Sequence, residues 1–488
     1  MPARRVLVVG IDGVRLDTLR RLPTPHLDAL AAAGFLAPVR VEEDTPTMSG
    51  PCWATVVTGV SVAKHAVWSN DFTGHRLDVF PDFATRLDQQ DGRRTFVAAG
   101  WRPLMLPRDG GPLFRAPSAT VHIAPRADTP EAWEECDERI TEAAARALTE
   151  DGPEAAFVYL GAPDETAHVL GCGEAYERSV VRADARLGRL LAAVRARPGH
   201  AAEEWTYLVV TDHGHVDAGG HGGRTDAERT AWLAAAGPGI GAAPGRVRHV
   251  DVAAQVYAAL GRHPDRHWTL DGRPFAARPH AVLLDMDGTL VDTESRWLDT
   301  VRATVPGIGA DDLHTALGRS TPDTAALLHP LAGTDPDTLA ARLESRFLDA
   351  VRQETALLPG VRELFTLLDE LSIPTALVSA SSRPVVDAVL KLLADAGVPA
   401  FDATVTAGET RRTKPHADPY LAAARALGAD PAACLAVEDS PTGVAAAEAA
   451  GCRVLAVPSY LPVEPGPGRT VRDGLGGLTV EDLWAAGL

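Results

Sequence analysis

The stretch HAVLLDMDGTLVDT, residues 280–293, carries the strongest local signal in this sequence of 488 residues. Its apolar run, residues 281–284, predicts a buried strand of a parallel sheet. Two carboxylates, Asp285 and Asp287, follow at once, and Gly288 then turns the chain toward a helical pattern. Ligands of open α/β sheets bind outside the carboxyl ends of the strands, so this pair of acids predicts a reaction centre.

A strand and helix of this kind usually open a domain, yet a long polypeptide precedes them, and the length predicts two to three domains. We predict an α/β fold in two domains, each a mostly parallel sheet flanked by helices. The first spans residues 1–262. Residues 263–279, which carry Gly, Pro, Arg and His without apolar periodicity, form a linker. The second spans residues 280–488 and contains a helical cap insert at about 294–356.

The composition limits the classes of function. The net charge of -18 and the pI of about 5.3 argue against a binder of nucleic acid or of a membrane surface. The five cysteines are scattered and lack CxxC spacing, which is typical of reduced thiols. The sequence shows neither a secretory leader pattern nor an apolar run of membrane-spanning length. We therefore expect a cytoplasmic protein that acts on small molecules; its oligomeric state stays open.

Acids, imidazoles and one hydroxyl cluster near the ends of predicted strands, which lie in the run 5–13, with an acid at its tip, and at residues 155–160 and 205–211. They are Asp12, Ser49, Asp164, His168, Asp212, His213 and His221. Carboxylates and imidazoles together suit divalent metals of the zinc or manganese type. Each residue alone has a plainer reading; Ser49, for example, is more often a helix N-cap than a nucleophile. Their joint occurrence favours a two-metal site in which Ser49, near a helix N-terminus, is the nucleophile.

Residues 5–261 resemble the alkaline phosphatase superfamily, and most of all its type I phosphodiesterase/nucleotide pyrophosphatase branch. The resemblance lies in the segments Val9–Arg15, Pro46–Pro51, Thr55–Gly59, Pro163–Gly171, Thr211–Gly214 and His221–Gly223. It implies that Ser49 is the nucleophile and that two divalent metals, Zn or Mn, bind. One metal would be held by Asp12, Ser49, Asp212 and His213, and the other by Asp164, His168 and His221.

Two positions depart from that pattern. Cys52 stands three residues after Ser49, where the branch usually has an Asn that helps to hold the phosphate, and Ala167 replaces the usual Gly before His168. Residues 65–130 lack periodicity and are predicted to form loops and short elements around a pocket. A phosphodiesterase, a phosphomonoesterase and a phosphonate-cleaving enzyme therefore stay open for this region.

A second set of residues falls at the ends of strands predicted at 281–284, 375–379, 404–407, 434–437 and 453–457. They are Asp285, Asp287, Ser379, Lys414, Glu438 and Asp439. An Asp nucleophile can form an aspartyl phosphate, and a second Asp can transfer the protons. Lys and Ser neutralise and orient phosphoryl oxygens, while further carboxylates suit Mg²⁺. Singly, each of these residues could be a turn acid, a loop charge or a strand-end cap.

Residues 281–460 resemble the haloacid dehalogenase-like superfamily, in the subfamily of β-phosphoglucomutase and phosphoglycolate phosphatase. The resemblance lies in Asp285–Thr289, Val378–Ser381, Lys414–Pro415 and Glu438–Gly443. It implies Asp285 as nucleophile, Asp287 as acid/base, and Ser379 and Lys414 as phosphoryl binders. Mg²⁺ would sit on Asp285, the Asp287 carbonyl and Asp439, with Glu438 in support. Leu317–Ser320, with Arg319, resembles the specificity loop of the cap.

The sequence thus predicts a bifunctional phosphate-ester hydrolase acting on small phosphorylated metabolites, such as a sugar phosphate or nucleotide. Three alternatives remain open. The second domain could be a phosphomutase, because mutases share its motifs. The first could be a phosphomonoesterase or phosphonate hydrolase. One domain could also be a degenerate binding module that regulates the other.

Overall fold

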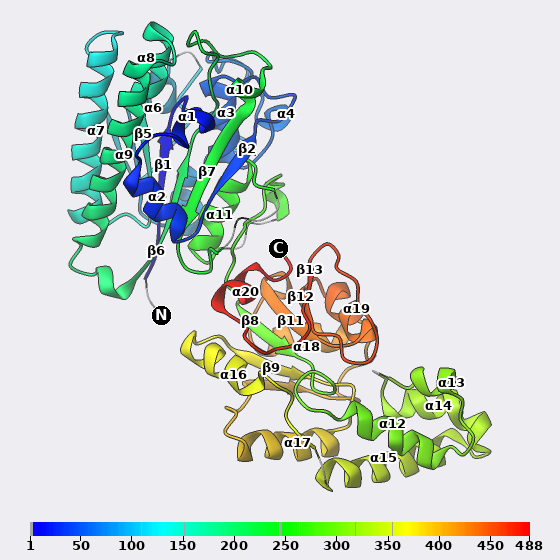
Figure 1. Ribbon diagram of the computed structural model, residues 1–488. Coiled ribbons are helices and arrows are strands. Elements are labelled where there is room, and N and C mark those ends of the chain that lie inside the picture. Colours follow the sequence, from blue (N-terminus) through cyan, green and yellow to red (C-terminus); the bar gives the residue numbers. More distant parts are fainter. Residues whose placement is uncertain are drawn as a thin grey trace. The chain divides into compact units, whose positions relative to one another are not determined.

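The computed structural model describes residues 3–488 except 109, 151, 242, 244, 245, 263, 265, 318 and 354, and the side chains of 266 and 314 are not described either. The chain forms two compact units, Met1–Arg278 and Pro279–Leu488 (Figure 1). Positions 263 and 265 of the predicted linker, and Gly318 of the predicted specificity loop, lie outside the described residues. The domain boundaries expected at residues 262 and 280 stay a prediction.

The first unit is built on a seven-stranded sheet in the order β2-β7-β6-β1-β5-β3-β4. Strand β7 is antiparallel to both of its neighbours, and the other pairings are parallel. The strands are β1 (Ala3–Ile11), β2 (Phe35–Arg40), β3 (Thr95–Ala99), β4 (Ala119–His122), β5 (Ala155–Leu160), β6 (Glu203–Val210) and β7 (Thr230–Ala236).

Helices connect and cover these strands, with α7 packed on α9 and β5, and α11 on α3 and β1. The helices are α1 (Leu16–Leu19), α2 (Pro25–Ala32), α3 (Ser49–Thr58), α4 (Val62–His65), α5 (Phe83–Asp91), α6 (Arg102–Met105), α7 (Pro130–Glu150), α8 (Ala162–Leu170), α9 (Glu174–Arg195), α10 (Asp226–Arg229) and α11 (Asp251–Ala259), with 3-10 turns η1 (His200–Ala202) and η2 (Arg266–Trp268). Within the described residues, no helix is both long and apolar enough to span a bilayer.

The second unit has a six-stranded parallel sheet in the order β10-β9-β8-β11-β12-β13. Its strands are β8 (Ala281–Leu284), β9 (Thr375–Val378), β10 (Ala403–Val405), β11 (Cys434–Glu438), β12 (Arg453–Ala456) and β13 (Arg469–Val471). The helices beside the sheet are α16 (Val361–Glu370), α17 (Arg383–Asp395), α18 (Asp418–Ala426), α19 (Pro441–Ala449) and α20 (Val480–Ala485), with the 3-10 turn η3 (Pro431–Ala433).

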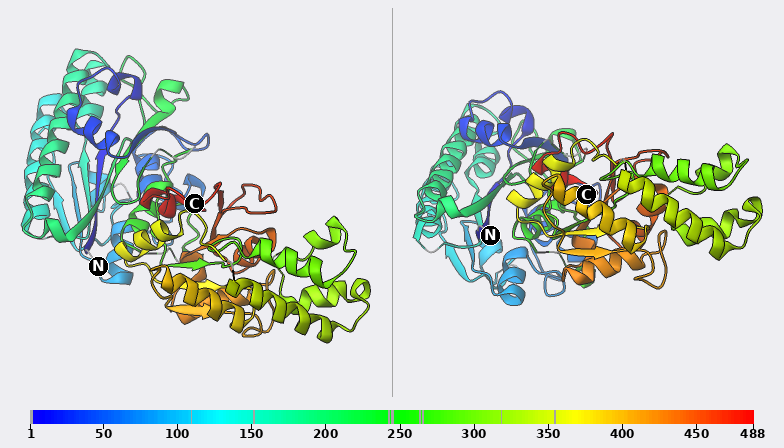
Figure 2. Two further views of the ribbon diagram at one scale, coloured as in Figure 1. Left: turned by 60° about the horizontal axis from the view of Figure 1, so that its bottom comes forward. Right: turned by 90° about the horizontal axis from the view of Figure 1, so that it is seen from below.

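Four helices between β8 and α16 form the cap of the second unit. They are α12 (Glu294–Thr304), α13 (Ala310–His314), α14 (Thr321–Ala332) and α15 (Pro336–Gln353). Helix α15 packs on both α12 and α14, and the group extends away from the sheet of its unit (Figure 2). The predicted fold class, two mostly parallel α/β sheets flanked by helices with a helical insert in the second, is confirmed.

The predicted strands correspond to β1, β5, β6 and β8 to β12. Residues 65–130 do form loops and short elements, but the prediction did not include the five-residue strand β3 as part of the sheet, where it is fully buried and pairs with β5 and β4. Five residues between polar segments are too few to show a period. The antiparallel β7 is also not predicted, because its partners β2 and β6 are distant in the sequence.

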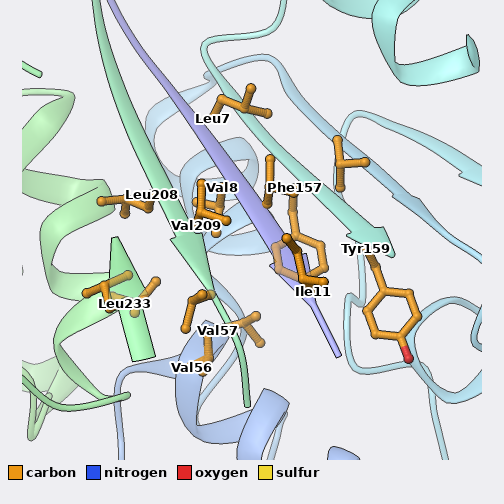
Figure 3. Packing of buried hydrophobic residues seen from close by; sticks show 14 of the residues in the cluster. Leu7, Val8, Ile11, Val56, Val57, Phe157, Tyr159, Leu208, Val209 and Leu233 are labelled. Atoms are coloured by element: carbon orange, nitrogen blue, oxygen red, sulfur yellow. The ribbon is translucent and has the colours of Figure 1, made fainter. Parts of the chain in front are cut away.

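Strand β1 lies in the middle of the first sheet and is buried on both faces. Residues 6–9, Val-Leu-Val-Val, are at most 1% exposed, as expected for a parallel strand covered on both sides. Figure 3 shows Leu7, Val8 and Ile11 packed among Phe157, Leu208, Val209, Val56 and Val57. Trp53 of α3 meets Phe157 edge to face, with ring centroids 5.7 Å apart. This packing fixes α3 against the carboxyl end of β1.

Gly10 provides a test of that packing. A Cβ at this position would lie 2.5 Å from Cη2 and 2.8 Å from Cζ3 of Trp53, so Gly10→Ala must displace a fully buried indole. We expect it to lower the free energy of unfolding of the first unit by about 1–3 kcal/mol in urea titrations followed by tryptophan fluorescence. In Gly199→Ala the new Cβ meets only Glu203 Oε1 at 3.7 Å, and the change should stay within about 0.5 kcal/mol. Equal effects of the two substitutions would contradict this account.

Candidate active sites

The polar residues of the first unit gather where β1, β5 and β6 end. Asp12 follows β1, helix α8 with Asp164 and His168 begins just after β5, and Asp212 and His213 follow β6. The three strands are neighbours and parallel, so their carboxyl ends meet at one edge of the sheet. The residues therefore converge although up to two hundred positions separate them in the sequence.

Asp12, Asp212 and His213 form one group whose ligand atoms lie within 4.8 Å of one another. His213 Nε2 is 3.3 Å from Asp212 Oδ2 and 3.7 Å from Asp12 Oδ1. Ser49 Oγ lies 3.5 Å from the same nitrogen. The structure thus brings together all four residues that the sequence predicted for one metal.

Asp164, His168 and His221 form a second group within the same limit. His168 Nε2 lies 3.4 Å from Asp164 Oδ2 and 2.9 Å from His221 Nε2. Two imidazole nitrogens at this separation converge on one point, as ligands of a shared ion do. The second predicted set is therefore also assembled in the structure, directly beside the first.

Several buried carboxylate oxygens in this cluster have no hydrogen-bond partner among the described residues. Trp53 Nε1 and Tyr159 Oη donate to Asp12 Oδ2 at 2.9 and 2.7 Å. Asp12 Oδ1, Asp212 Oδ2 and Asp164 Oδ1 are left without such partners. Buried, unpaired oxygens are costly unless a cation satisfies them. Their arrangement, together with the imidazoles, fits divalent cations.

Burial sets the protonation of these groups. It raises the pKa of Asp12 to about 7, with a further upward contribution from Asp164. It also raises the pKa of Asp212 well above its ordinary value, and Asp12 and Asp164 add to this effect. Burial, assisted by His221, lowers the pKa of His213, so this imidazole is neutral at pH 7. Without a cation, the site holds fewer charges than its residue types suggest.

Ser49 is the first residue of α3, and the N-cap is Met48, so the N-cap reading of Ser49 is wrong. Its side chain is almost fully buried beside the metal groups. The next residue, Gly50, donates its backbone N–H to Asn70 Oδ1 at 2.8 Å. The Asn70 oxygen is thereby fixed at the start of α3, and its NH₂ group is the end that can donate to a ligand.

Cys52 cannot replace the Asn expected at its position as a phosphate contact. Its thiol is fully buried and donates to the Pro46 carbonyl oxygen at 3.3 Å. Burial and the nearby Asp212 raise the pKa of this thiol well above its ordinary value. Asn70, which the sequence did not single out, lies in a polar loop 20 positions from Gly50, and its side-chain oxygen accepts the Gly50 N–H in the first turn of α3.

The sequence reasoning also missed His215. Its imidazole is fully buried, and Nε2 lies 2.8 Å from Asp164 Oδ1. A local signal was present, because the sequence reads Asp212-His213-Gly214-His215, which places a second imidazole two positions after a predicted ligand.

The raised pKa of Asp12 predicts how stability depends on pH in the metal-free protein. The folded state holds a proton that the unfolded chain releases near pH 4, so the free energy of unfolding of the first unit should fall as the pH rises from about 4 through about 7. Urea titrations across this range in the presence of a chelator measure the slope. Asp12→Asn keeps an oxygen for Trp53 and Tyr159 to bind and should reduce the slope.

Added Zn²⁺ or Mn²⁺ should reverse this trend, because cations bind the deprotonated groups. A slope that is the same in Asp12→Asn and in the unsubstituted protein would contradict the assignment.

In the second unit, two carboxylates and one backbone carbonyl hold a lysine at the carboxyl ends of β8, β9 and β11. Lys414 Nζ donates to Asp285 Oδ1 at 2.5 Å, to Glu438 Oε1 at 2.6 Å and to the Val378 carbonyl at 2.8 Å. Asp285, Glu438 and Asp439 form a further group with ligand atoms within 4.8 Å. The sequence-predicted residues are thus together in the structure.

The negative charge of this group exceeds what Lys414 neutralises. Burial, with Glu438, raises the pKa of Asp285 to about 8 although Lys414 opposes the shift. Burial and the charges of Asp285 and Glu438 also raise the pKa of Asp439. Crowded oxygen ligands with unneutralised charge fit a hard divalent cation. Gly288, at φ +80, leaves room here, because a Cβ would collide with Asp439 Oδ2.

Three hydroxyl groups hold the carboxylate of Asp287. Thr293 Oγ1 donates to Oδ1 at 2.6 Å, and Ser379 and Ser381 each donate to Oδ2 at 3.0 Å. Burial nevertheless raises the pKa of Asp287. The hydroxyl of Ser379, predicted to bind the phosphoryl group, therefore donates to Asp287 in this structure, and the hydroxyl of Ser381 donates to the same oxygen.

A pocket lies between these residues and the cap of the same unit. The cap contributes Trp297, Arg319, Thr321 and Phe347 to its lining. The rings of Trp297 and Phe347 meet edge to face, 5.0 Å apart. The guanidinium of Arg319 is exposed and donates to the Thr315 carbonyl through Nε. The lining of the pocket thus combines the carboxylates with two aromatic rings and the guanidinium of the cap.

Comparison with known families finds a match for each of the two units. Residues 6–280 match Type I phosphodiesterase / nucleotide pyrophosphatase, and residues 279–451 match haloacid dehalogenase-like hydrolase. The first match covers more than half of the chain, so the protein belongs to the type I phosphodiesterase/nucleotide pyrophosphatase family, and its second unit is a haloacid dehalogenase-like hydrolase. Both resemblances predicted from the sequence are confirmed. The protein is a hydrolase of phosphate esters.

Individual relatives match part of the chain. Hexitol phosphatase A of Escherichia coli (strain K12) is 38% identical over 188 residues, which are 37% of this chain and 83% of that protein. Protein CbbY of Rhodobacter capsulatus is 34% identical over 196 residues, 37% of this chain and 85% of that protein. The crystal structure of CbbY from Rhodobacter sphaeroides in complex with phosphate covers 41% of this chain and 96% of its own, at 24% identity and a TM-score of 0.36.

Proposed function

We propose that the protein cleaves two kinds of phosphate ester at two separate centres. The first unit hydrolyses a phosphodiester or pyrophosphate with Ser49 as nucleophile, and the second hydrolyses a phosphomonoester through Asp285. The observation that carries the proposal is the presence of two complete sets of residues, each at the carboxyl edge of its own sheet. Each set contains an oxygen nucleophile beside a cation-binding group.

In the first unit, Asp12, Ser49, Asp212 and His213 would hold one divalent cation, Zn or Mn, and Asp164, His168 and His221 the other. Bound cations supply positive charge that favours the Ser49 alkoxide and withdraws electrons from phosphorus. Ser49 Oγ attacks phosphorus, the alcohol or phosphate leaving group departs, and water then cleaves the phosphoserine. Asn70, anchored by the Gly50 N–H, donates its NH₂ to a phosphate oxygen and orients it.

In the second unit, Asp285 attacks a phosphomonoester and Lys414 fixes its carboxylate for the attack. Asp287, whose pKa burial raises, gives its proton to the leaving alcohol and later takes one from water, which cleaves the aspartyl phosphate. Asp285, Glu438, Asp439 and the Asp287 carbonyl would hold Mg²⁺, which neutralises charge on the phosphoryl oxygens. When the substrate binds, Ser379 would turn its hydroxyl from Asp287, and Lys414 one N–H from Glu438, to those oxygens, while Ser381 keeps holding Asp287.

We infer that the substrate of the second unit is a small phosphorylated metabolite such as a sugar phosphate. Support comes from the similarity to hexitol phosphatase A and from a cavity in which Trp297 and Phe347 can pack on the carbon chain while Arg319 meets an anion. Joined in one polypeptide, the two reactions would convert a diester such as a nucleotide-sugar to a phosphomonoester and then to the free alcohol.

Single substitutions should separate the two activities. Ser49→Ala should lower hydrolysis of bis-p-nitrophenyl phosphate by at least about 10³-fold in kcat/KM and leave Mg²⁺-dependent phosphate release from phosphosugars unchanged. Asp285→Asn should do the reverse. Each variant is the other's control, and both are assayed in the full-length protein with Zn²⁺, Mn²⁺ and Mg²⁺ separately.

Ser49→Ala protein that retains all phosphoesterase activity would overturn the assignment of the first unit. In Asp285→Asn protein, a stronger activity on p-nitrophenyl phosphate than on its diester would make the first unit a monoesterase. Conversion of a phosphosugar to its isomer without phosphate release would make the second unit a mutase.

Asn70 and Cys52 can be compared directly as phosphate contacts. Asn70→Ala removes the amide fixed at the start of α3 and should lower kcat/KM for the diester by about 10²-fold. Cys52→Ala removes a thiol bonded only to a backbone carbonyl among the described residues and should change kcat/KM less than about threefold. Steady-state kinetics with bis-p-nitrophenyl phosphate measures both, and a larger loss in Cys52→Ala would contradict the role given to Asn70.

A further inference from the structure

His215 is a buried imidazole in the first unit to which neither metal set assigns a role. Its Nδ1 lies 2.9 Å from the Gly219 carbonyl oxygen. A carbonyl oxygen only accepts, so Nδ1 donates its hydrogen to it, and Nε2 is the ring nitrogen that remains for a ligand. This nitrogen faces Asp164 Oδ1 at 2.8 Å. Neither atom is aligned for a hydrogen bond with a described residue, so both are placed to bind one cation.

The same arrangement recurs in the neighbouring imidazoles predicted to bind metal. His213 Nδ1 lies 3.2 Å from the Gly214 carbonyl oxygen, and His221 Nδ1 lies 2.8 Å from that of Thr47. Metal-bound histidines usually donate their second ring N–H to a carbonyl or carboxylate, which fixes the tautomer and the ring orientation. The Gly219 carbonyl therefore holds His215 in the way that carbonyls hold metal-bound histidines, through Nδ1. His249 is held through its other ring nitrogen, because its Nε2 faces the Thr211 carbonyl at 2.9 Å.

Gly13 keeps the space beside this pair of atoms free. A Cβ at position 13 would lie 2.5 Å from His215 Nε2 and 2.6 Å from Asp164 Oδ1. Its φ of +66 is also one that residues with a side chain rarely adopt. The loop after β1 thus leaves the approach to both atoms open at the point where a cation would satisfy them.

We propose that His215 Nε2 is a ligand of the cation bound at Asp164, in addition to His168 and His221. Asp164 belongs to two possible ligand groups, one with His168 and His221 and one with His213 and His215. His213 is committed to the other cation, beside Asp12 and Asp212. The inference rests on the two-metal function proposed above. It gives the Asp164 cation three imidazoles and one carboxylate, a donor set that favours zinc over the harder magnesium and manganese.

The test is the count of imidazole ligands in the full-length protein loaded with Co²⁺. Each histidine bound through Nε2 contributes one exchangeable Nδ1–H proton resonance shifted by the paramagnetic ion. To keep Co²⁺ out of the second unit, the protein carries Asp439→Asn. We expect four such resonances, from His168, His213, His215 and His221, and three in His215→Gln. Calorimetric titration with Zn²⁺ should show one of two equivalents in the first unit weakened by at least about 10-fold in His215→Gln.

The control is His249→Gln, which alters a buried imidazole outside the ligand groups and should keep all four resonances and both zinc affinities. Three resonances in the Co²⁺ protein with an unaltered His215 would overturn the proposal, and this count stands even if His215→Gln fails to fold. Weaker zinc binding with all four resonances kept in His215→Gln would make His215 a positioning residue only and would also overturn it. Four resonances without diesterase activity would instead refute the proposed function.

Discussion

The constraint on which the rest of the structure depends is the placement of several carboxylates in one buried space. Asp12, Asp164 and Asp212 are at most 6% exposed and lie at the ends of adjacent parallel strands. Like charges at low dielectric repel strongly, and burial penalises each of them further. Such a site is stable only with protons or cations. The surrounding fold holds these carboxylates in place for the cations proposed above, and Trp53 and Tyr159 fix Asp12 from the core.

The two units meet this constraint with different chemistry. The first surrounds its carboxylates with neutral imidazoles, which add nitrogen ligands but no charge, and so suits borderline metals. The second places Lys414 among its carboxylates and leaves an all-oxygen group, which suits a hard ion. The nucleophiles proposed for the two units differ accordingly. A serine hydroxyl must lose a proton to attack, whereas an aspartate needs only to be held ionised and aimed.

Much of the fold was predictable because local patterns are strong. Apolar runs marked β1, β5, β6 and most strands of the second sheet, and the polar residues at their ends marked the sites. Strand β3 and antiparallel β7 were not predictable. Whether such a short apolar segment forms a strand depends on the strands elsewhere in the chain with which it pairs. The contact of Asn70 with Gly50 was hidden for the same reason, since it joins two segments 20 positions apart.

By itself, the sequence determined the two families, the order of the nucleophiles, acids and imidazoles, and the class of reaction. Those features follow from residue types at fixed local spacings, such as Asp285-Met286-Asp287 and Asp212-His213. Only the tertiary structure decided which atoms face each other. The tautomer of His215, the oxygen of Asp164 that it meets and the hydroxyls that hold Asp287 depend on contacts across the sheet edge. Such contacts arise from packing of distant segments, and no local pattern encodes them.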